Sequence, residues 1–118
     1  MKTSSCKAKG RKLQQWVRDI ILESFPSLEA DDVRSTSMGA GGEDVQLSPA
    51  ARKLFPYSVE CKSVEKLNVW AAYEQAEANS GKYEPILVMK KNRKKPLVVL
   101  DAEAFIALIK DKDCDNIN

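Results

Sequence analysis

The spacing of apolar residues predicts an alternation of helices and strands. From Gly10 to about Ser24, large apolar side chains recur at helical spacing, and Pro26 steers the preceding residue out of helical geometry, which ends the helix. The apolar stripe consists of Leu13, Trp16, Val17, Ile20 and Ile21. One face of this helix is therefore expected to lie against a core.

Short apolar and polar alternations predict strands over residues 32–37, 43–47 and 57–62. The segment 48–56, which joins the second and third of these strands, contains two prolines. We expect it to form a short helical turn that begins at Pro49, because proline is favoured at the first position of a helix.

The second half of the chain predicts two helices and two strands. A helix is expected over about 68–79, where Gly81 suits the end. The continuous apolar runs 85–90 and 96–100 predict strands buried on both faces, joined by the basic loop 91–95. Asp101 is expected to cap a last helix that extends to about Lys110. The buried side of this helix is expected to comprise Phe105, Ile106, Leu108 and Ile109.

The order of elements is helix, three strands, helix, two strands and helix, which is an α/β sandwich around a mixed sheet. The chain of 118 residues suits one domain with one core. We expect residues 1–9 and 112–118 to be flexible. The apolar runs are too short to span a membrane, and no signal-peptide apolar segment follows the basic start, so a cytoplasmic protein is expected.

Composition narrows the chemistry open to the chain. It contains no histidine, which excludes Ser-His-Asp and Cys-His nucleophilic sites and His-ligated zinc. Cys6, Cys61 and Cys114 lack zinc-site spacing and are expected to be reduced thiols. The glycines at 39–42 lack the lysine and spacing of a nucleotide phosphate loop. An enzyme with this composition must use carboxylates and lysine.

The net charge of +2 is unevenly spread. The first eighteen residues carry six basic residues and no acidic one, and a second basic run covers 90–95. Such runs suit the phosphates of DNA, although each is equally consistent with a solvated surface.

Two carboxylates and a lysine form the candidate site. Glu60 and Lys62 lie two residues apart on one predicted strand and so share a face, and Asp44 joins them if its strand is a neighbour. Magnesium commonly takes one or two carboxylates, with water and phosphate oxygens as its other ligands. A lysine beside it can orient or help deprotonate the attacking water. The alternative is a solvated strand face, which an acidic-x-Lys tripeptide often forms.

This pattern resembles the PD-(D/E)XK nuclease superfamily, in which an Asp, a Glu-x-Lys and often a Gln on the next helix form the site. Asp44, Glu60-Cys61-Lys62 and Gln75 match it. The chain is most similar to Holliday junction resolvases of the archaeal and phage type, also through Lys9-Gly10-Arg11 and Ser35-Thr36-Ser37. It departs from the pattern at Glu43, where the superfamily name has proline, and at Gln14, where those resolvases usually carry a glutamate.

The resemblance implies a restriction-endonuclease-like fold and a magnesium-dependent endodeoxyribonuclease, with Mn²⁺ as a possible substitute. Asp44, Glu60 and the Cys61 backbone carbonyl would hold the metal, Lys62 would activate water, and Gln75 would assist. A homodimer would make paired nicks in a four-way junction, in the cytoplasm, which for a phage protein is that of the host cell. The candidate DNA contacts are Lys9, Arg11, Lys12, Ser37, Lys53, Arg93 and Lys94.

Three other functions stay open at this point. The chain could be another DNA nuclease of the superfamily, of the nickase, restriction or repair type. It could be a non-catalytic DNA-binding module that keeps the fold, which the replacement of an acid by Gln14 favours. It could also be an interaction protein with incidental basic patches, in which case DNA binding would be absent or insensitive to salt.

Overall fold

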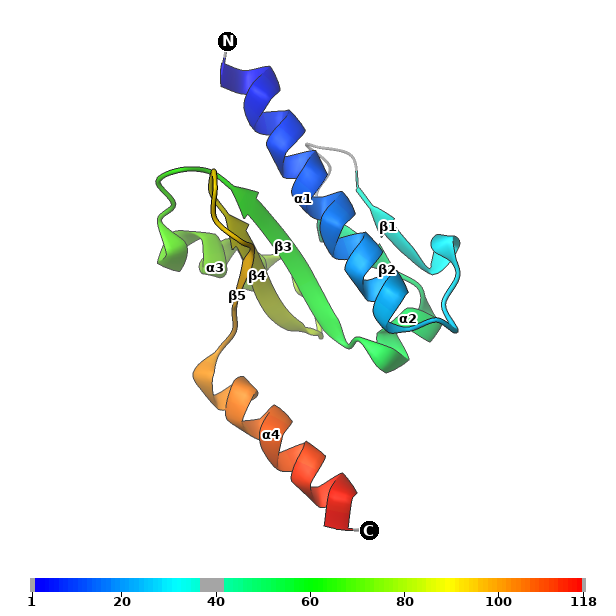
Figure 1. Ribbon diagram of the computed structural model, residues 1–118. Helices are drawn as coiled ribbons and strands as arrows, with labels where there is room; N and C mark the ends of the chain where they lie inside the picture. Colours follow the sequence, from blue (N-terminus) through cyan, green and yellow to red (C-terminus); the bar gives the residue numbers. More distant parts are fainter. Residues whose placement is uncertain (1, 37–41, 118) are drawn as a thin grey trace.

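Figure 1 shows the computed structural model, which describes residues 2–36 and 42–117, with side-chain burial for 6–36 and 42–112. The elements are α1 (Lys2–Ser24), the 3-10 turn η1 (Ala30–Asp32), β1 (Val33–Ser35), β2 (Val45–Leu47), α2 (Pro49–Leu54), β3 (Tyr57–Ser63), α3 (Val69–Ala78), β4 (Glu84–Lys90), β5 (Leu97–Val99) and α4 (Ala102–Ile117). Their order follows the alternation that the apolar spacing predicts.

The strands form one mixed sheet in the order β1-β2-β3-β4-β5. Neighbouring strands are antiparallel except β3 and β4, which are parallel and are joined through α3. The predicted α/β domain with a mixed sheet and flanking helices is therefore confirmed.

Helices cover both faces of the sheet. α1 packs against β1, β2 and β3, and α3 packs against β3 and β4 on the opposite face (Figure 1). Ala72 and Ala76 are buried, and these small side chains let α3 approach the sheet closely. The core between α1 and the sheet comprises Leu13, Val17, Ile21, Leu28, Val33, Val45, Ala51, Val59, Cys61, Ile86 and Val88.

Local signals account for the short helix α2. Pro49 occupies its first turn, as predicted, and Ser48 Oγ accepts a hydrogen bond from Ala51 N at 3.1 Å. The same hydroxyl donates to Asp32 Oδ1 at 2.6 Å. Ser48 therefore caps α2 and fixes it to the segment before β1.

Two helices are longer than the sequence suggested. α1 begins at Lys2 rather than Gly10, and α4 extends to Ile117 rather than to Lys110. Lysine and alanine favour helix, no proline interrupts either segment, and the single glycine inside α1 costs only about 1 kcal/mol. Within the described residues, none of the helices combines the length and apolar character needed to cross a membrane.

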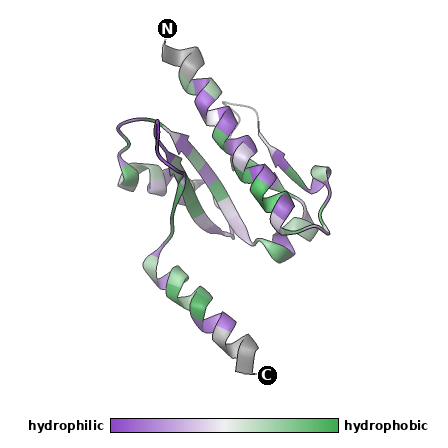
Figure 2. Ribbon diagram, viewed as in Figure 1, coloured by the Kyte–Doolittle hydropathy of each residue, from purple (hydrophilic) through white to green (hydrophobic). Residues whose placement is uncertain are grey.

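Two predictions of burial are wrong. β5 lies at the edge of the sheet, where Leu97 and Val98 are exposed. The apolar side of α4 is also exposed, because this helix projects away from the sheet after Leu100 (Figures 1 and 2). The exposed residues of α4 are the four that were expected to be buried: Phe105, Ile106, Leu108 and Ile109.

Candidate functional site

The candidate site forms where β2 separates from β3. The two strands pair only at Val45 and Val59, and Asp44 N donates to Val59 O at 3.0 Å. Farther along β3, Cys61 N donates to Asp44 Oδ2 at 2.7 Å. The carboxylate of Asp44 thus takes the place of a strand carbonyl as hydrogen-bond acceptor. Since the N–H and C=O of a strand residue point toward the same neighbouring strand, the Cys61 carbonyl also points toward the Asp44 side of β3.

Glu60 lies on the face of the sheet opposite to α1. Its neighbours Val59 and Cys61 belong to the core under α1, so Glu60 and Lys62 project toward α3, as alternation predicts. Glu60 is only 4% exposed, and its Oε2 lies 3.7 Å from Lys62 Nζ. Its Oε1 accepts a hydrogen bond from Asn79 Nδ2, at the end of α3, at 3.4 Å. The Glu60 carboxylate is therefore held on both sides.

Electrostatics at the site favours a bound cation. Burial raises the pKa of Asp44 above its ordinary value, although the Cys61 N–H and the Lys62 charge oppose the shift. Burial and the nearby charge of Asp44 raise the pKa of Glu60, against hydrogen bonding from Asn79 and the charge of Lys62. A divalent cation would offset both the desolvation of these carboxylates and their repulsion.

The thiol of Cys61 has no part in this chemistry. Burial, together with the charges of Asp44 and Glu60, raises the pKa of Cys61 far above its ordinary value. A thiol with a raised pKa is mostly protonated at neutral pH and is a poor nucleophile. The contribution of Cys61 to the site is restricted to its backbone.

The donor set fits a hard divalent metal. Two carboxylates and a backbone carbonyl supply oxygen ligands, which Mg²⁺ and Mn²⁺ prefer. The described part of the chain contains no group of three or more His, Cys, Asp or Glu side chains that could hold a metal. Gln14, at the position of the resolvase glutamate, is buried on α1. A metal here would therefore depend on water and substrate oxygens to complete its shell, as is common for Mg²⁺.

The raised pKa of Glu60 makes a prediction about stability in metal-free buffer. The pKa of Glu60 is higher in the native state than in the unfolded chain. Between these two pKa values the native state keeps a proton that the unfolded chain has lost, so the free energy of unfolding falls as pH rises through this range. Glu60→Gln, which cannot ionise, should therefore melt a few degrees higher than wild type at neutral pH. The difference should vanish below about pH 4, where both states are protonated. Thermal melts across pH measure this, with the exposed Glu74→Gln as control; a lower melting temperature of Glu60→Gln at neutral pH would contradict it.

An ion pair between Glu43 and Arg52 fixes the segment that carries Asp44. The side chains of Glu43 and Arg52 form a largely buried ion pair, and Arg52 Nη1 donates to Tyr57 O at 2.9 Å. The guanidinium also lies 4.1 Å from the centre of the Tyr83 ring. Arg52 therefore joins α2 to the segment before β2 and to the start of β3.

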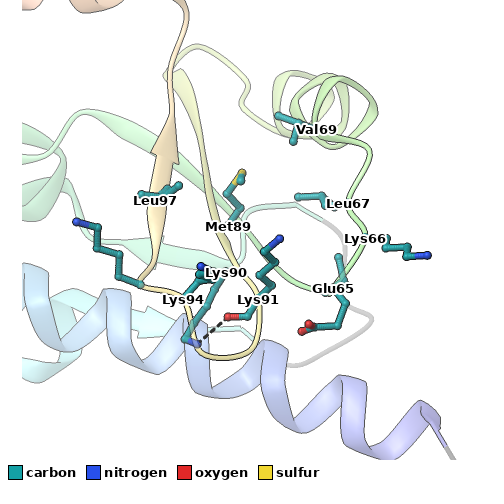
Figure 3. Close-up of a pocket in the computed structure, with 11 residues that line it drawn as sticks. Glu65, Lys66, Leu67, Val69, Met89, Lys90, Lys91, Lys94 and Leu97 are labelled. Carbon is teal, nitrogen blue, oxygen red and sulfur yellow. Dashed lines mark hydrogen bonds between the residues drawn. The ribbon is translucent and has the colours of Figure 1, made fainter.

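A pocket rich in lysine lies at the carboxyl ends of β3 and β4 (Figure 3). It has a volume of about 570 Å³ and an apolar floor that includes Leu67, Met89 and Leu97. Its rim is shaped by the hydrogen bond from Asn92 N to Glu65 Oε2, at 2.7 Å. We call it the lysine pocket, after Lys66, Lys90, Lys91, Lys94 and Lys95, which line it.

A second basic hollow lies on the α1 side of the same strand ends. Lys9 and Lys12 of α1 line it together with Ser63 and Lys90. Two of the three candidate DNA contacts on α1, Lys9 and Lys12, thus lie beside the β4–β5 hairpin, which carries the lysine pocket. Lys62 pairs in register with Met89, and Ser63 with Lys90, so the basic surface starts one residue beyond Lys62.

The other candidate DNA contacts are more dispersed. Arg11 is exposed on α1, Arg93 is exposed in the hairpin turn, and Lys53 is exposed on α2, outside both hollows. Ser37 lies outside the described residues. The structure therefore gathers Lys9, Lys12 and Lys94 at one end of the sheet and leaves Lys53 apart.

The sequence did not indicate two features of the site, the contact of Asn79 with Glu60 and the Glu43–Arg52 ion pair. Gln75 is exposed on α3, and within the described structure its side chain makes no hydrogen bond to Glu60 or Lys62. Asn79, one helical turn later, reaches Glu60 instead. The four-residue spacing could have indicated it, because residues four apart share a helix face. The Glu43–Arg52 pair had no signal in the local pattern.

A scan against protein-family models, a search of curated proteins and a search of solved structures each returned no match to this chain. The resemblance to the nuclease superfamily therefore depends on the motif residues themselves. The chemistry of the site has to be inferred from its geometry.

Proposed function

We propose that the protein is a divalent-metal-dependent endodeoxyribonuclease with a restriction-endonuclease-like fold, acting on four-way DNA junctions. The observation that carries this proposal is the joint placement of Asp44 and Glu60. Asp44 is fixed by Cys61 N–H at 2.7 Å, and the buried Glu60 pairs with Lys62 at 3.7 Å on the same strand. An arrangement of two carboxylates and one ammonium beside a basic surface suits hydrolysis of a phosphodiester.

Asp44, Glu60 and the Cys61 carbonyl would hold Mg²⁺ or Mn²⁺. When bound, the metal supplies a lower pKa for the attacking water and neutralises charge that develops on the phosphate. Lys62 is half-buried, and its ammonium can donate a hydrogen bond to the attacking water or to a phosphate oxygen. Asn79 holds Glu60 Oε1 and so leaves Oε2 facing Lys62. The assisting role of Gln75 stays a prediction, and Asn79 is a second candidate for the same role.

The distribution of lysines supports a branched nucleic acid as substrate. The lysine pocket and the hollow beside α1 lie on the two sides of the β3 and β4 ends, next to Lys62. Phosphates from two duplex arms could therefore approach the same site from different directions. A homodimer would bring two such sites to symmetrically related strands, and the reaction would take place in the cytoplasm, or in that of the host for a phage protein.

The direct test compares a labelled immobile junction with a linear duplex of matched sequence, each with Mg²⁺ or EDTA. We expect paired, magnesium-dependent nicks at symmetrical positions in the junction. Equal cleavage of the duplex would favour a nickase, restriction or repair nuclease. Tight binding with no cleavage in Mg²⁺ or Mn²⁺ would identify a non-catalytic binding module.

Charge reversal in the lysine pocket should weaken DNA binding. Lys91→Glu/Lys94→Glu removes two lysines whose contacts with phosphates would release counterions from the DNA. Affinity for the junction should therefore fall about tenfold or more. The salt dependence of binding should become shallower by about one to two phosphate contacts. Binding titrations at several salt concentrations measure both effects. The matched control is Lys82→Glu/Lys110→Glu, which changes the same charge at exposed sites outside both hollows. An equal loss in the control would show that only net charge matters.

A further inference from the structure

Helix α4 presents an apolar face to solvent. Asp101 caps its start, where Ala104 N donates to Asp101 Oδ2 at 2.9 Å. Ile106 is 63% exposed and Phe105 is 50% exposed, and Leu108 and Ile109 are each 46% exposed. Figure 2 shows apolar stretches along α4, which lies away from the sheet. An isolated helix of this length is marginally stable in water, so α4 gains from packing against another surface.

A matching apolar cleft lies between α1 and the β4–β5 edge. We call it the α1 cleft; its volume is about 480 Å³. Trp16 and Ile20 of α1 form one wall and remain exposed because only Leu13, Val17 and Ile21 of their stripe reach the core. The remaining exposed apolar residues that line it are Leu54, Leu97 and Val98, with Leu108 of α4 at its rim.

The combined apolar surface is large for a chain of this size. Nine large apolar side chains of α4 and the α1 cleft are at least 40% exposed. At on the order of 80 Å² each, they present about 700 Å² of apolar surface. Single chains rarely expose apolar patches beyond about 300–600 Å². The estimate is close to the roughly 800 Å² that each partner contributes to a standard protein interface.

We propose that two copies of this chain pair by exchanging α4, so that α4 of each copy lies in the α1 cleft of the other. One chain carries both the projecting apolar helix and the apolar cleft, and Leu108 makes them one continuous surface. Docking one helix therefore brings the second helix to the second cleft, which closes a two-fold dimer. A second copy supplies a complement to both halves of this surface at once, whereas a different partner would need separate apolar surfaces for the helix and for the cleft.

The connection between β5 and α4 favours exchange over fold-back. Only Leu100 and Asp101 separate the two elements, and Leu100 packs against the core. Asp101 also caps α4, so the helix begins directly after β5 and the connection has little slack. Covering the whole α1 cleft with the helix of the same chain would require this connection to be rearranged. The pairing surface contains none of Asp44, Glu60 or Lys62, so it is tested independently of cleavage.

The test measures molar mass by light scattering and sedimentation over a wide concentration range. We expect wild type to be a dimer and Ile109→Glu, which places a charge in the middle of the apolar face, to raise the dimer dissociation constant at least about tenfold. The matched control Ala107→Glu adds the same charge on the opposite side of α4 and should leave the dimer intact. Circular dichroism checks that each variant is folded.

A mixing experiment separates exchange from other arrangements. Ile20→Glu damages the cleft and leaves the helix intact, while Ile109→Glu does the reverse. At concentrations at which wild type is a dimer, each variant alone should be mostly monomeric. An equal mixture should recover dimers, because one intact helix can dock into one intact cleft. Wild type that stays monomeric at every concentration, a dimer that tolerates Ile109→Glu, or a mixture that recovers no dimer would overturn the proposal.

Discussion

Asp44→Asn should abolish magnesium-dependent cleavage of a four-way junction, lowering the single-turnover rate by about a thousandfold or more. The substitution removes the charge that would hold the metal beside Glu60. An asparagine oxygen can still accept the hydrogen bond from Cys61 N, which Asp44 Oδ2 accepts at 2.7 Å. The strand geometry should therefore persist, and the loss should belong to the chemical step.

Binding and a matched substitution distinguish this loss from misfolding. Asp44→Asn should bind the junction in EDTA as tightly as wild type, because the lysine pocket and the second basic hollow, lined by Lys9 and Lys12, are unchanged. Asp31→Asn alters an exposed carboxylate in η1, before the edge strand β1 and two strands away from β3, and it should cleave at the wild-type rate. Cleavage by Asp44→Asn at close to the wild-type rate would contradict the site.

Arg52→Met should reduce the free energy of unfolding by about 3 kcal/mol, because it leaves the carboxylate of Glu43 largely buried without its charged partner. It also removes the hydrogen bond to Tyr57 O and the contact with the Tyr83 ring. Since Glu43 precedes Asp44, we expect weaker magnesium-dependent cleavage as well. Urea denaturation monitored by circular dichroism measures the loss of stability.

The neighbouring lysine provides the control for Arg52. Lys53→Met changes an exposed residue of the same helix and should alter the free energy of unfolding by no more than about 0.5 kcal/mol. The double variant Glu43→Gln/Arg52→Met should recover part of the loss, because no unpaired charge stays buried. Equal destabilisation by Arg52→Met and Lys53→Met would show that the ion pair contributes little.

The sequence was sufficient where the deciding interactions are local. Alternation along β3 placed Glu60 and Lys62 on one face, because this depends only on the pleat of one strand. The start of α2 at Pro49 likewise depends on residues within one turn. The periodicity of α4 identified its apolar face correctly, but periodicity does not reveal which surface covers that face. For the same reason, the apolar run of β5 did not indicate that it is an edge strand.

The candidate site was harder to predict because its contacts cross between elements. The hydrogen bond from Cys61 N to Asp44 depends on how β2 leaves β3, and this register is not encoded in either strand alone. Asn79 rather than Gln75 reaches Glu60 because the rotation of α3 about its axis is set by Ala72 and Ala76 against the sheet. Arg52 reaches Glu43 only after α2 has turned the chain back.

The most direct test of the central claim is a crystal structure with Mn²⁺, whose anomalous scattering locates the metal. We expect one ion bound by carboxylate oxygens of both Asp44 and Glu60 at about 2.0–2.2 Å, with the Cys61 carbonyl as a further ligand. The assignment of this site would be contradicted if, at saturating Mn²⁺, no ion lay between the two carboxylates or ions were bound only elsewhere on the surface.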